Sequence, residues 1–283
     1  YDSAGLAIRK EEGLIDRCRT VGKVEKLSNA LEKCPVKGPL GIAHTRWATH
    51  GIPSEPNAHP HMSRDMLAVV HNGIIENYEI LRETLKEKGY TFSSETDTET
   101  IVNLVHSKLE ETGDLLEAVK LSLGDLEGAY AFCVISRDDP DRIITARLGS
   151  PLVIGLGIGE NFIASDVHAL LPVTQRFIFL EEGDVAEVRR DQVTIFDANG
   201  NQVEREERES SLSAAATDKG PYRHYMQKEI HEQADAICNT LEGRIGEDQV
   251  FETIFGPQAS ALFDQVKRIR IIACGTSFHA GMV

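Results

Sequence analysis

Three short segments concentrate the residue types that can bind and activate a small polar substrate. They are residues 44–51 (HTRWATHG), 71–77 (HNGIIEN) and 94–99 (SETDTE). Each follows a predicted strand or precedes a predicted helix, where functional side chains are common. The three segments are therefore the candidates for a functional site.

Together these segments offer the groups that a free amino acid with a side-chain amide, such as glutamine, would need. Arg46 can bind an α-carboxylate through two parallel hydrogen bonds, and Asp97 can accept hydrogen bonds from an α-ammonium. The Asn72 side chain and the Gly73 backbone N–H can donate to the oxyanion that forms when the amide carbonyl is attacked. Losing one such donor typically costs about 3–4 kcal/mol of transition-state stabilisation.

The same residues also have simpler structural interpretations. Asp97 precedes a helix pattern and could serve only as its N-cap. Arg46 could pair with a structural carboxylate, and Asn72-Gly73 could form only a tight turn. Trp47 is the only tryptophan, and a lone aromatic residue is more often part of a core. The residues alone leave these alternatives open.

Metal and cofactor sites are not indicated. Five of the ten histidines lie between His44 and His71, but their spacing does not resemble the three or four converging ligands of a zinc site. Residues 155–159 (GLGIG) lack the spacing and the following helix of a dinucleotide-binding loop, and we expect a hairpin turn there. We predict no metal and no cofactor.

The element pattern predicts an α+β domain over residues 1–203. Helical spacing of apolar residues, or helix start and stop residues, appear at 24–33, 76–88, 94–109 and 115–126. Strand patterns appear at 6–9, 14–19, 40–45, 66–71, 129–136, 142–148, 151–155, 161–164, 176–180, 184–188 and 192–196. This order departs from strict βαβ alternation. It predicts two antiparallel sheets with helices on their outer faces, and residues 198–201 (ANGN) predict a hairpin turn.

A change of composition predicts a second part of the chain. Residues 204–221 combine a charge run with small polar residues, which is typical of a linker. Residues 222–241 and 258–266 are helix candidates, and 268–273 is a predicted strand. Cys274-Gly275-Thr276-Ser277 follows that strand and opens a further helix, which predicts the start of an α/β domain over residues 222–283.

Bulk properties exclude some classes of partner. The net charge is −15, and no basic footprint for nucleic acid is present. No apolar run approaches the roughly 18 residues of a membrane span, so we expect no membrane partner. The five cysteines are scattered, without a C-x-x-C pair, which favours a reduced cytoplasmic location.

The motifs resemble those of the class-II, N-terminal-nucleophile glutamine amidotransferases. Besides the three segments above, residues 1–5 (YDSAG), 149–155 (GSPLVIG) and 222–230 (YRHYMQKEI) occur in the same order as in that family. They look most like the branch that forms glucosamine 6-phosphate, and the C-G-T-S motif separates this branch from relatives that make phosphoribosylamine or asparagine. The resemblance implies a four-layer αββα sandwich, followed by the start of a sugar-isomerase (SIS) domain.

The resemblance also implies roles for single residues. Arg46, Thr49, His50 and Asp97 match glutamine-binding positions, and Asn72 and Gly73 match the oxyanion hole. Trp47 matches a residue that gates an ammonia channel. The triplet Gly275, Thr276 and Ser277 matches a contact to the phosphate of the sugar, because N–H groups and hydroxyls at a helix start can hold an anion.

The implied mechanism needs an N-terminal cysteine, whose own α-amine acts as base. Glutamine is hydrolysed, and the ammonia reacts with fructose 6-phosphate to give glucosamine 6-phosphate in an enzyme that is usually a homodimer. Residue 1 is Tyr1, and no cysteine stands at the required place. We therefore expect a piece cut at both ends that does not hydrolyse glutamine alone. The alternatives are an inactive glutamine-binding or regulatory module, or another class-II amidotransferase.

Overall fold

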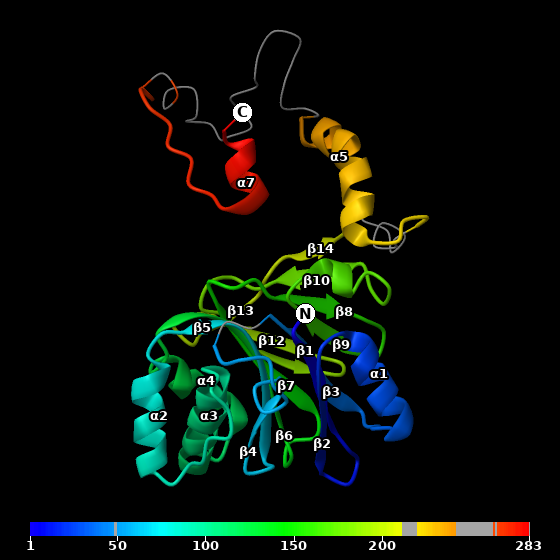
Figure 1. Cartoon of the computed structure of the whole chain (residues 1–283). Helices are drawn as coiled ribbons and strands as arrows, with labels where there is room; N and C mark the ends of the chain where they lie inside the picture. Colours follow the sequence, from blue (N-terminus) through cyan, green and yellow to red (C-terminus); the bar gives the residue numbers. More distant parts are fainter. Residues whose placement is uncertain (48–49, 211–219, 242–262, 264, 283) are drawn as a thin grey trace. The chain divides into compact units, whose positions relative to one another are not determined.

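The computed structural model describes residues 1–47, 50–210, 220–241, 263 and 265–282. The chain forms two compact units, Tyr1–Thr217 and Asp218–Val283. The first unit contains the three segments that carry candidate chemistry near the amino-terminal end, and it is built from three antiparallel sheets with helices outside them (Figure 1).

The largest sheet has seven strands in the order β13-β12-β11-β7-β6-β5-β4. Its strands are β4 (His61–Ser63), β5 (Leu67–Ile75), β6 (Gly128–Ser136), β7 (Arg142–Leu148), β11 (Val185–Arg189), β12 (Val193–Phe196) and β13 (Gln202–Val203). β5 and β6 pair over nine positions, from Leu67↔Ser136 to Ile75↔Gly128. This long pairing fixes the part of β5 that carries the second candidate segment.

Two smaller sheets form the other β layer. The three-stranded sheet has the order β2-β1-β3, with β1 (Ser3–Arg9), β2 (Ile15–Val21) and β3 (Leu40–Arg46). The four-stranded sheet has the order β14-β10-β8-β9, with β8 (Val153–Leu156), β9 (Asn161–Ala164), β10 (Arg176–Phe179) and β14 (Glu207–Glu209). Where two sheets were predicted, the second β layer is therefore divided.

Helices cover both outer faces. On one side lie α2 (Tyr78–Glu87), α3 (Thr98–Thr112) and α4 (Leu115–Leu123), and on the other lies α1 (Val24–Lys33) (Figure 1). The short 3-10 helix η1 (Val167–Ala169) packs against the four-stranded sheet through Val167. α3 is the central helix, because ten successive residues from Thr98 to Ser107 are buried. α4 begins where the Asp114 side chain accepts a hydrogen bond from the Glu117 N–H at 3.0 Å, as an N-cap should.

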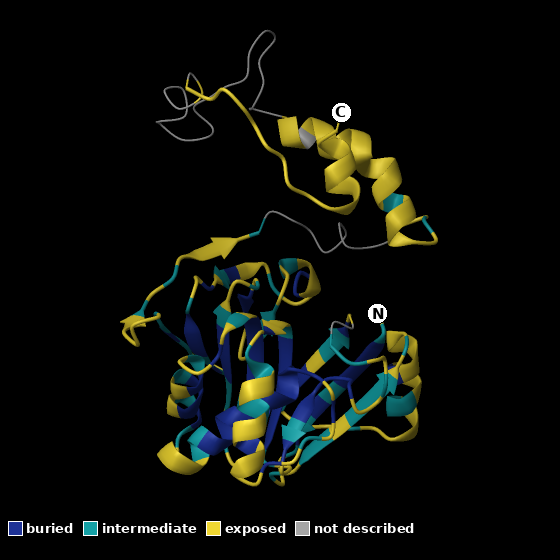
Figure 2. Ribbon diagram, turned by 60° about the vertical axis from the view of Figure 1, so that its left-hand side comes forward, coloured by how far each residue is buried: buried dark blue, intermediate teal, exposed yellow. Residues whose placement is uncertain are grey.

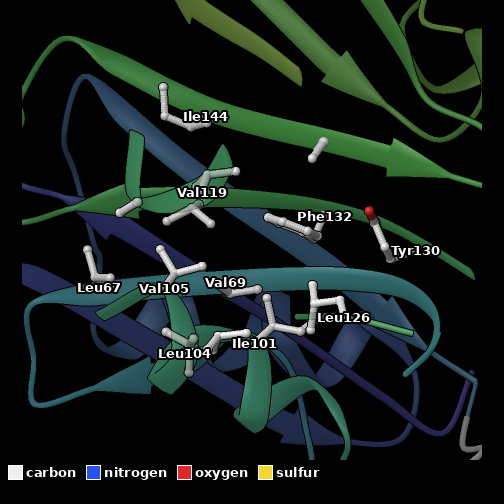
Figure 3. Packing of buried hydrophobic residues seen from close by; sticks show 14 of the residues in the cluster. Leu67, Val69, Ile101, Leu104, Val105, Val119, Leu126, Tyr130, Phe132 and Ile144 are labelled. Atoms are coloured by element: carbon white, nitrogen blue, oxygen red, sulfur yellow. The ribbon is translucent and has the colours of Figure 1, made fainter. Parts of the chain in front are cut away.

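Buried residues gather on the strands of the first unit (Figure 2), and their apolar side chains pack into clusters between the layers. The main cluster joins α3 and α4 to the seven-stranded sheet, with Val105, Val119 and Phe132 among its members (Figure 3). Separate clusters join that sheet to the three-stranded and the four-stranded sheets. The layer order is helices, sheet, two sheets, helices, which confirms the α+β, four-layer αββα sandwich.

Several element predictions need correction. β4, β13 and β14 were not predicted, and β14 lies within the predicted linker 204–221; residues 211–219 of that linker lie outside the described residues. The charge run reaches the sheet because its charges find partners there: Arg205 forms two hydrogen bonds to Asp184, and Glu207 pairs with Arg176.

The second unit contains α5 (Tyr225–Leu241) and α7 (Gly275–Ala280) in its described part. Most of the helix predicted at 258–266 falls outside the described residues. The strand predicted at 268–273 is wrong: no described residue pairs with this segment, and an apolar segment does not form a strand without a partner. Within the described residues, no helix is long and apolar enough to span a membrane.

Candidate functional site

A cavity of about 860 Å³ opens in the first unit. Its walls come from β1, β3, β5, β6 and β9, and from the start of α3. Six predicted site residues line it: Arg46, Trp47, His50, Asn72, Gly73 and Asp97. Thr49 lies outside the described residues. Predicted site residues that lie up to 51 positions apart in the sequence, Arg46 and Asp97, therefore line the same cavity.

Arg46 ends β3 and is 4% exposed. Its Nη2 donates to the backbone oxygens of His50 and Gly51, the latter at 3.0 Å. Its Nη1 is buried and has no hydrogen-bond partner among the described residues. Burial lowers the pKa of Arg46, while the nearby carboxylates of Asp2 and Asp97 act in the opposite direction. A buried charged donor without an acceptor is costly, so the cavity is suited to an anionic group at this point.

Asp97 precedes α3 and is 3% exposed. It occupies the N-cap position, but its backbone is helical and its side chain makes no capping hydrogen bond. Instead, Oδ2 accepts a hydrogen bond from the Ile75 N–H at 2.9 Å. Among the described residues, no donor reaches Oδ1. The carboxylate is thus anchored to β5 and keeps one oxygen for a cationic ligand group.

Asn72 and Gly73 lie inside β5, so the tight-turn alternative is wrong. The Asn72 Oδ1 accepts a hydrogen bond from His44 Nε2 at 2.7 Å, and within the described part of the chain no second hydrogen bond holds this side-chain amide. Gly73 has φ +135°, and a Cβ there would lie 2.0 Å from the Ala129 oxygen. No side chain fits at this position, because the neighbouring strand's backbone occupies its place.

Trp47 and His50 lie beside Arg46 at the cavity. Trp47 is 78% exposed, so the alternative that it belongs to the core is wrong. The His50 ring contacts the Tyr78 ring edge-on, with centroids 5.3 Å apart. The His50 Nδ1 is buried without a partner among the described residues. Both residues are therefore placed where a ligand in the cavity can touch them.

Four histidines, three of them buried and His44 half-buried, form a cluster that the sequence did not assign to the site. His44 stacks on His59 with centroids 4.2 Å apart, and His59 contacts His61 edge-on at 5.0 Å. His71 donates its backbone N–H to His59 Nδ1, and its ring contacts the Thr98 hydroxyl at 3.0 Å. Burial lowers the pKa of all four rings, and that of His71 falls to about 4 despite the opposing charge of Asp97.

These four rings are consequently neutral at pH 7. No group of three or more possible ligands that could hold a metal ion is found among the described residues.

One signal in the sequence could have found His44. It stands two residues before Arg46 on β3, and residues i and i+2 of a strand share a face.

Two buried side chains hold the loop that leads to Asp97. Glu99 accepts hydrogen bonds from the backbone N–H groups and the hydroxyls of Ser93 and Ser94, at 2.7–2.8 Å. The Asn57 side-chain amide forms two hydrogen bonds with Glu95, each of 2.9 Å: its Nδ2 donates to the Glu95 carboxylate, and its Oδ1 accepts from the Glu95 backbone N–H. Because the loop is held at both ends, Asp97 enters the site in one position.

Cys133 is the one described cysteine that lines the cavity. Its thiol lies on β6, 3.4 Å from the Thr145 hydroxyl, and burial raises its pKa to about 11. A thiol attacks as the thiolate, and at pH 7 a thiol of this pKa is almost fully protonated. Cys133 is therefore a poor nucleophile.

The predicted phosphate-contact residues lie in the second unit. Gly275, Thr276 and Ser277 form the first turn of α7, where all three are exposed. Cys274 precedes them without a side-chain capping bond. Their proposed contact to a sugar phosphate stays a prediction.

Residues 44–172 match the family of glutamine amidotransferase domains. This range contains every predicted site residue of the first unit. The match lies wholly within the first unit and agrees with the family that the motifs resemble.

The whole chain is similar to the glutamine--fructose-6-phosphate aminotransferases (isomerizing). Over 283 residues it is 60% identical to that of Pseudomonas aeruginosa, 61% to that of Yersinia pestis and 59% to that of Escherichia coli O6:H1. These matches cover all of this chain and 46% of each relative. The chain thus spans about half the length of the curated relatives it matches.

Solved structures agree on the fold. The glutamine phosphoribosylpyrophosphate amidotransferase of B. subtilis has a TM-score of 0.58 at 25% identity, over 71% of this chain and 44% of that one. A structure described as the allosteric regulatory enzyme of purine biosynthesis has a TM-score of 0.55 at 26% identity, over 75% of this chain and 44% of that one.

Proposed function

We propose that the first unit binds L-glutamine in the 860 Å³ cavity and forms the glutaminase half of an aminotransferase that makes glucosamine 6-phosphate. The observation that carries this proposal is the shared cavity of Arg46, Asp97, Asn72 and Gly73. A charged donor, a charged acceptor and an oxyanion-type donor pair are the three features that an α-amino acid amide requires.

Each end of glutamine finds a group of opposite charge. The α-carboxylate accepts hydrogen bonds from the buried Arg46 Nη1, which has no partner in the described part of the chain, and charge-assisted bonds of this kind are the stronger ones. The α-ammonium donates to Asp97 Oδ1. His50, Trp47 and Thr49 contact the bound amino acid or close the cavity over it, as the family resemblance implies.

Attack on the amide carbonyl places negative charge on its oxygen. The Asn72 Nδ2–H and the Gly73 N–H stabilise this charge as the tetrahedral intermediate forms. In the proposed reaction the nucleophile is the thiol of an N-terminal cysteine, as the family resemblance implies. Cys133 does not take this role, since its pKa of about 11 leaves little thiolate.

The released ammonia then aminates fructose 6-phosphate, giving glucosamine 6-phosphate and glutamate as the overall products. Identities of 59–61% to aminotransferases of this name, over the full chain, support this second half-reaction. Gly275, Thr276 and Ser277 contact the sugar phosphate in a completed isomerase domain. The full-length protein acts in the cytoplasm as a homodimer and needs neither metal nor cofactor.

Glutamine binding to residues 1–283 tests the first half of the proposal. Isothermal titration should show saturable binding of L-glutamine and at least tenfold weaker binding of D-glutamine. Asp97→Asn keeps an acceptor for the Ile75 N–H but removes the charge, and it should weaken L-glutamine at least tenfold. Asp138→Asn, an exposed carboxylate paired with Arg137, is the matched control and should bind as the wild type does.

Two outcomes would contradict the proposal. Equal binding of L-glutamine by Asp97→Asn and wild type would show that Asp97 does not contact the α-ammonium of glutamine. Ammonia release by residues 1–283, clearly above an uncatalysed blank, would contradict the part of the proposal that assigns the nucleophile to an N-terminal cysteine, because residue 1 is Tyr1.

A further inference from the structure

We infer that His44 is a positioning residue that fixes the Asn72 side-chain amide, through a hydrogen bond from Nε2–H to Oδ1, in the one orientation that leaves Nδ2 available to an oxyanion. This inference rests on the oxyanion role proposed for Asn72. It adds a residue from a different strand, β3, to the machinery on β5.

The location of the proton follows from the contact itself. His44 Nε2 and Asn72 Oδ1 are 2.7 Å apart, and an amide oxygen can only accept a hydrogen bond. The proton must therefore be on Nε2. Because burial lowers the pKa of His44, the ring is neutral at pH 7, and its other nitrogen, Nδ1, carries no hydrogen.

The His44 ring is held in place from two directions. Its strand pairs with β1, with Gly5 directly opposite His44. One ring face lies on His59 at 4.2 Å with an interplanar angle of 16°. His59 is fixed in turn, because its Nδ1 accepts the His71 N–H at 3.3 Å. The donor to Asn72 is thus part of an ordered stack of rings.

This hydrogen bond decides which end of the amide serves the substrate. An amide is planar and nearly symmetric in shape, so a rotation of 180° about its last bond exchanges oxygen and nitrogen with little steric change. Without His44, nothing in the described structure holds Oδ1. In the exchanged orientation the Asn72 Oδ1, which carries partial negative charge, would face the developing oxyanion and repel it. The bond also polarises the amide, which makes its N–H a stronger donor.

Kinetics of glutamine hydrolysis test the inference in a protein extended to the full length of the relatives. His44→Phe keeps a ring to stack on His59 but cannot donate, and we expect kcat to fall about 10- to 100-fold with KM nearly unchanged, below the 100- to 1,000-fold typical of losing a donor outright. His44→Gln, whose amide nitrogen can replace Nε2, should recover most of the rate.

Double-mutant kinetics separate positioning from a general structural effect. Asn72→Ala should lose about 100- to 1,000-fold in kcat, and adding His44→Phe to it should cause no further loss, because the partner is already gone. His106→Phe is the matched control: His106 is buried and bonded to the Ser63 hydroxyl at 2.8 Å, away from the cavity. It should lose stability but keep the wild-type kcat.

The results distinguish this inference from the proposed function. Wild-type kcat in Asn72→Ala would refute the oxyanion role and the proposal built on it. A normal effect of Asn72→Ala, together with either an unchanged kcat in His44→Phe or a full further loss in the double variant, would refute only the positioning role. In ¹⁵N-labelled residues 1–283, NMR should find His44 in the Nε2–H tautomer at pH 7, and the Nδ1–H tautomer would also overturn the inference.

Discussion

Acid should destabilise the first unit through its buried histidines, and His71 allows the effect to be calculated. Burial lowers the pKa of His71 to about 4, against a value of about 6.5 in the unfolded chain. Below pH 6.5 the unfolded chain takes up a proton that the folded chain does not. Stability is therefore lost as the pH falls from about 6.5 to about 4, and it is fully retained above that range.

The magnitude follows from the two pKa values. Between pH 7 and pH 5, proton uptake by the unfolded chain at this one position costs about 2 kcal/mol of unfolding free energy. That is a large share of the 5–15 kcal/mol typical of a domain. His59 and His61 add to the loss in the same direction, because burial lowers their pKa values well below the ordinary one.

Urea unfolding followed by far-UV circular dichroism measures this loss in wild type and His71→Gln. Glutamine cannot titrate in this range, and its amide can still bond the Thr98 hydroxyl that His71 contacts at 3.0 Å. The variant should lose about 2 kcal/mol less than wild type between pH 7 and pH 5. Carboxylates titrate in both proteins and cancel in the difference. Equal losses in the two proteins would refute the reasoning.

Two further predictions follow from single positions. Gly73→Ala should destabilise the first unit by at least about 2 kcal/mol, because its φ of +135° and the Ala129 oxygen, 2.0 Å from the position of a Cβ, both oppose a side chain. Gly124→Ala is the control, since its Cβ would meet nothing closer than 3.7 Å, and it should change thermal stability little. Equal melting temperatures of the two variants would contradict the steric argument. Cys133 should react with iodoacetamide at least 100-fold more slowly than exposed Cys34 at pH 8, since burial raises the pKa of Cys133 to about 11 and covers its thiol. Mass spectrometry of the labelled peptides measures the two rates. Similar rates would show that the Cys133 thiol is accessible.

The sequence predicted most of the fold where periodicity was strong. The helix at Val24–Lys33 and the strands at Arg142–Leu148 and Asn161–Ala164 have the predicted bounds. The failures have a common physical cause, which is a partner distant in sequence. β14 exists because it pairs with β10, and residues 268–273 form no strand because they have no partner among the described residues.

The candidate site shows the same limit. Local preference allowed a turn at Asn72-Gly73, but nine paired positions with β6 make it a strand. The residues around Asp97 predict a helix N-cap, yet its carboxylate accepts a hydrogen bond from the Ile75 N–H on β5. The motifs predicted which residues line the cavity. The contact between His44 and Asn72 joins two strands of different sheets, and no local pattern contains that information.

The placement of the two halves of the site has a consequence for how such proteins diversify. The proposed oxyanion donors, Asn72 and Gly73, lie toward the end of β5, where β6 pairs with the strand and β4 no longer does. Arg46 and the residues after it belong to the end of an edge strand and a loop. Replacements after Arg46 can therefore change the proposed contacts to the amino acid while the pairing with β6 keeps Asn72 and Gly73 in place. Over evolution, one chemical step can serve new nitrogen donors at little structural risk.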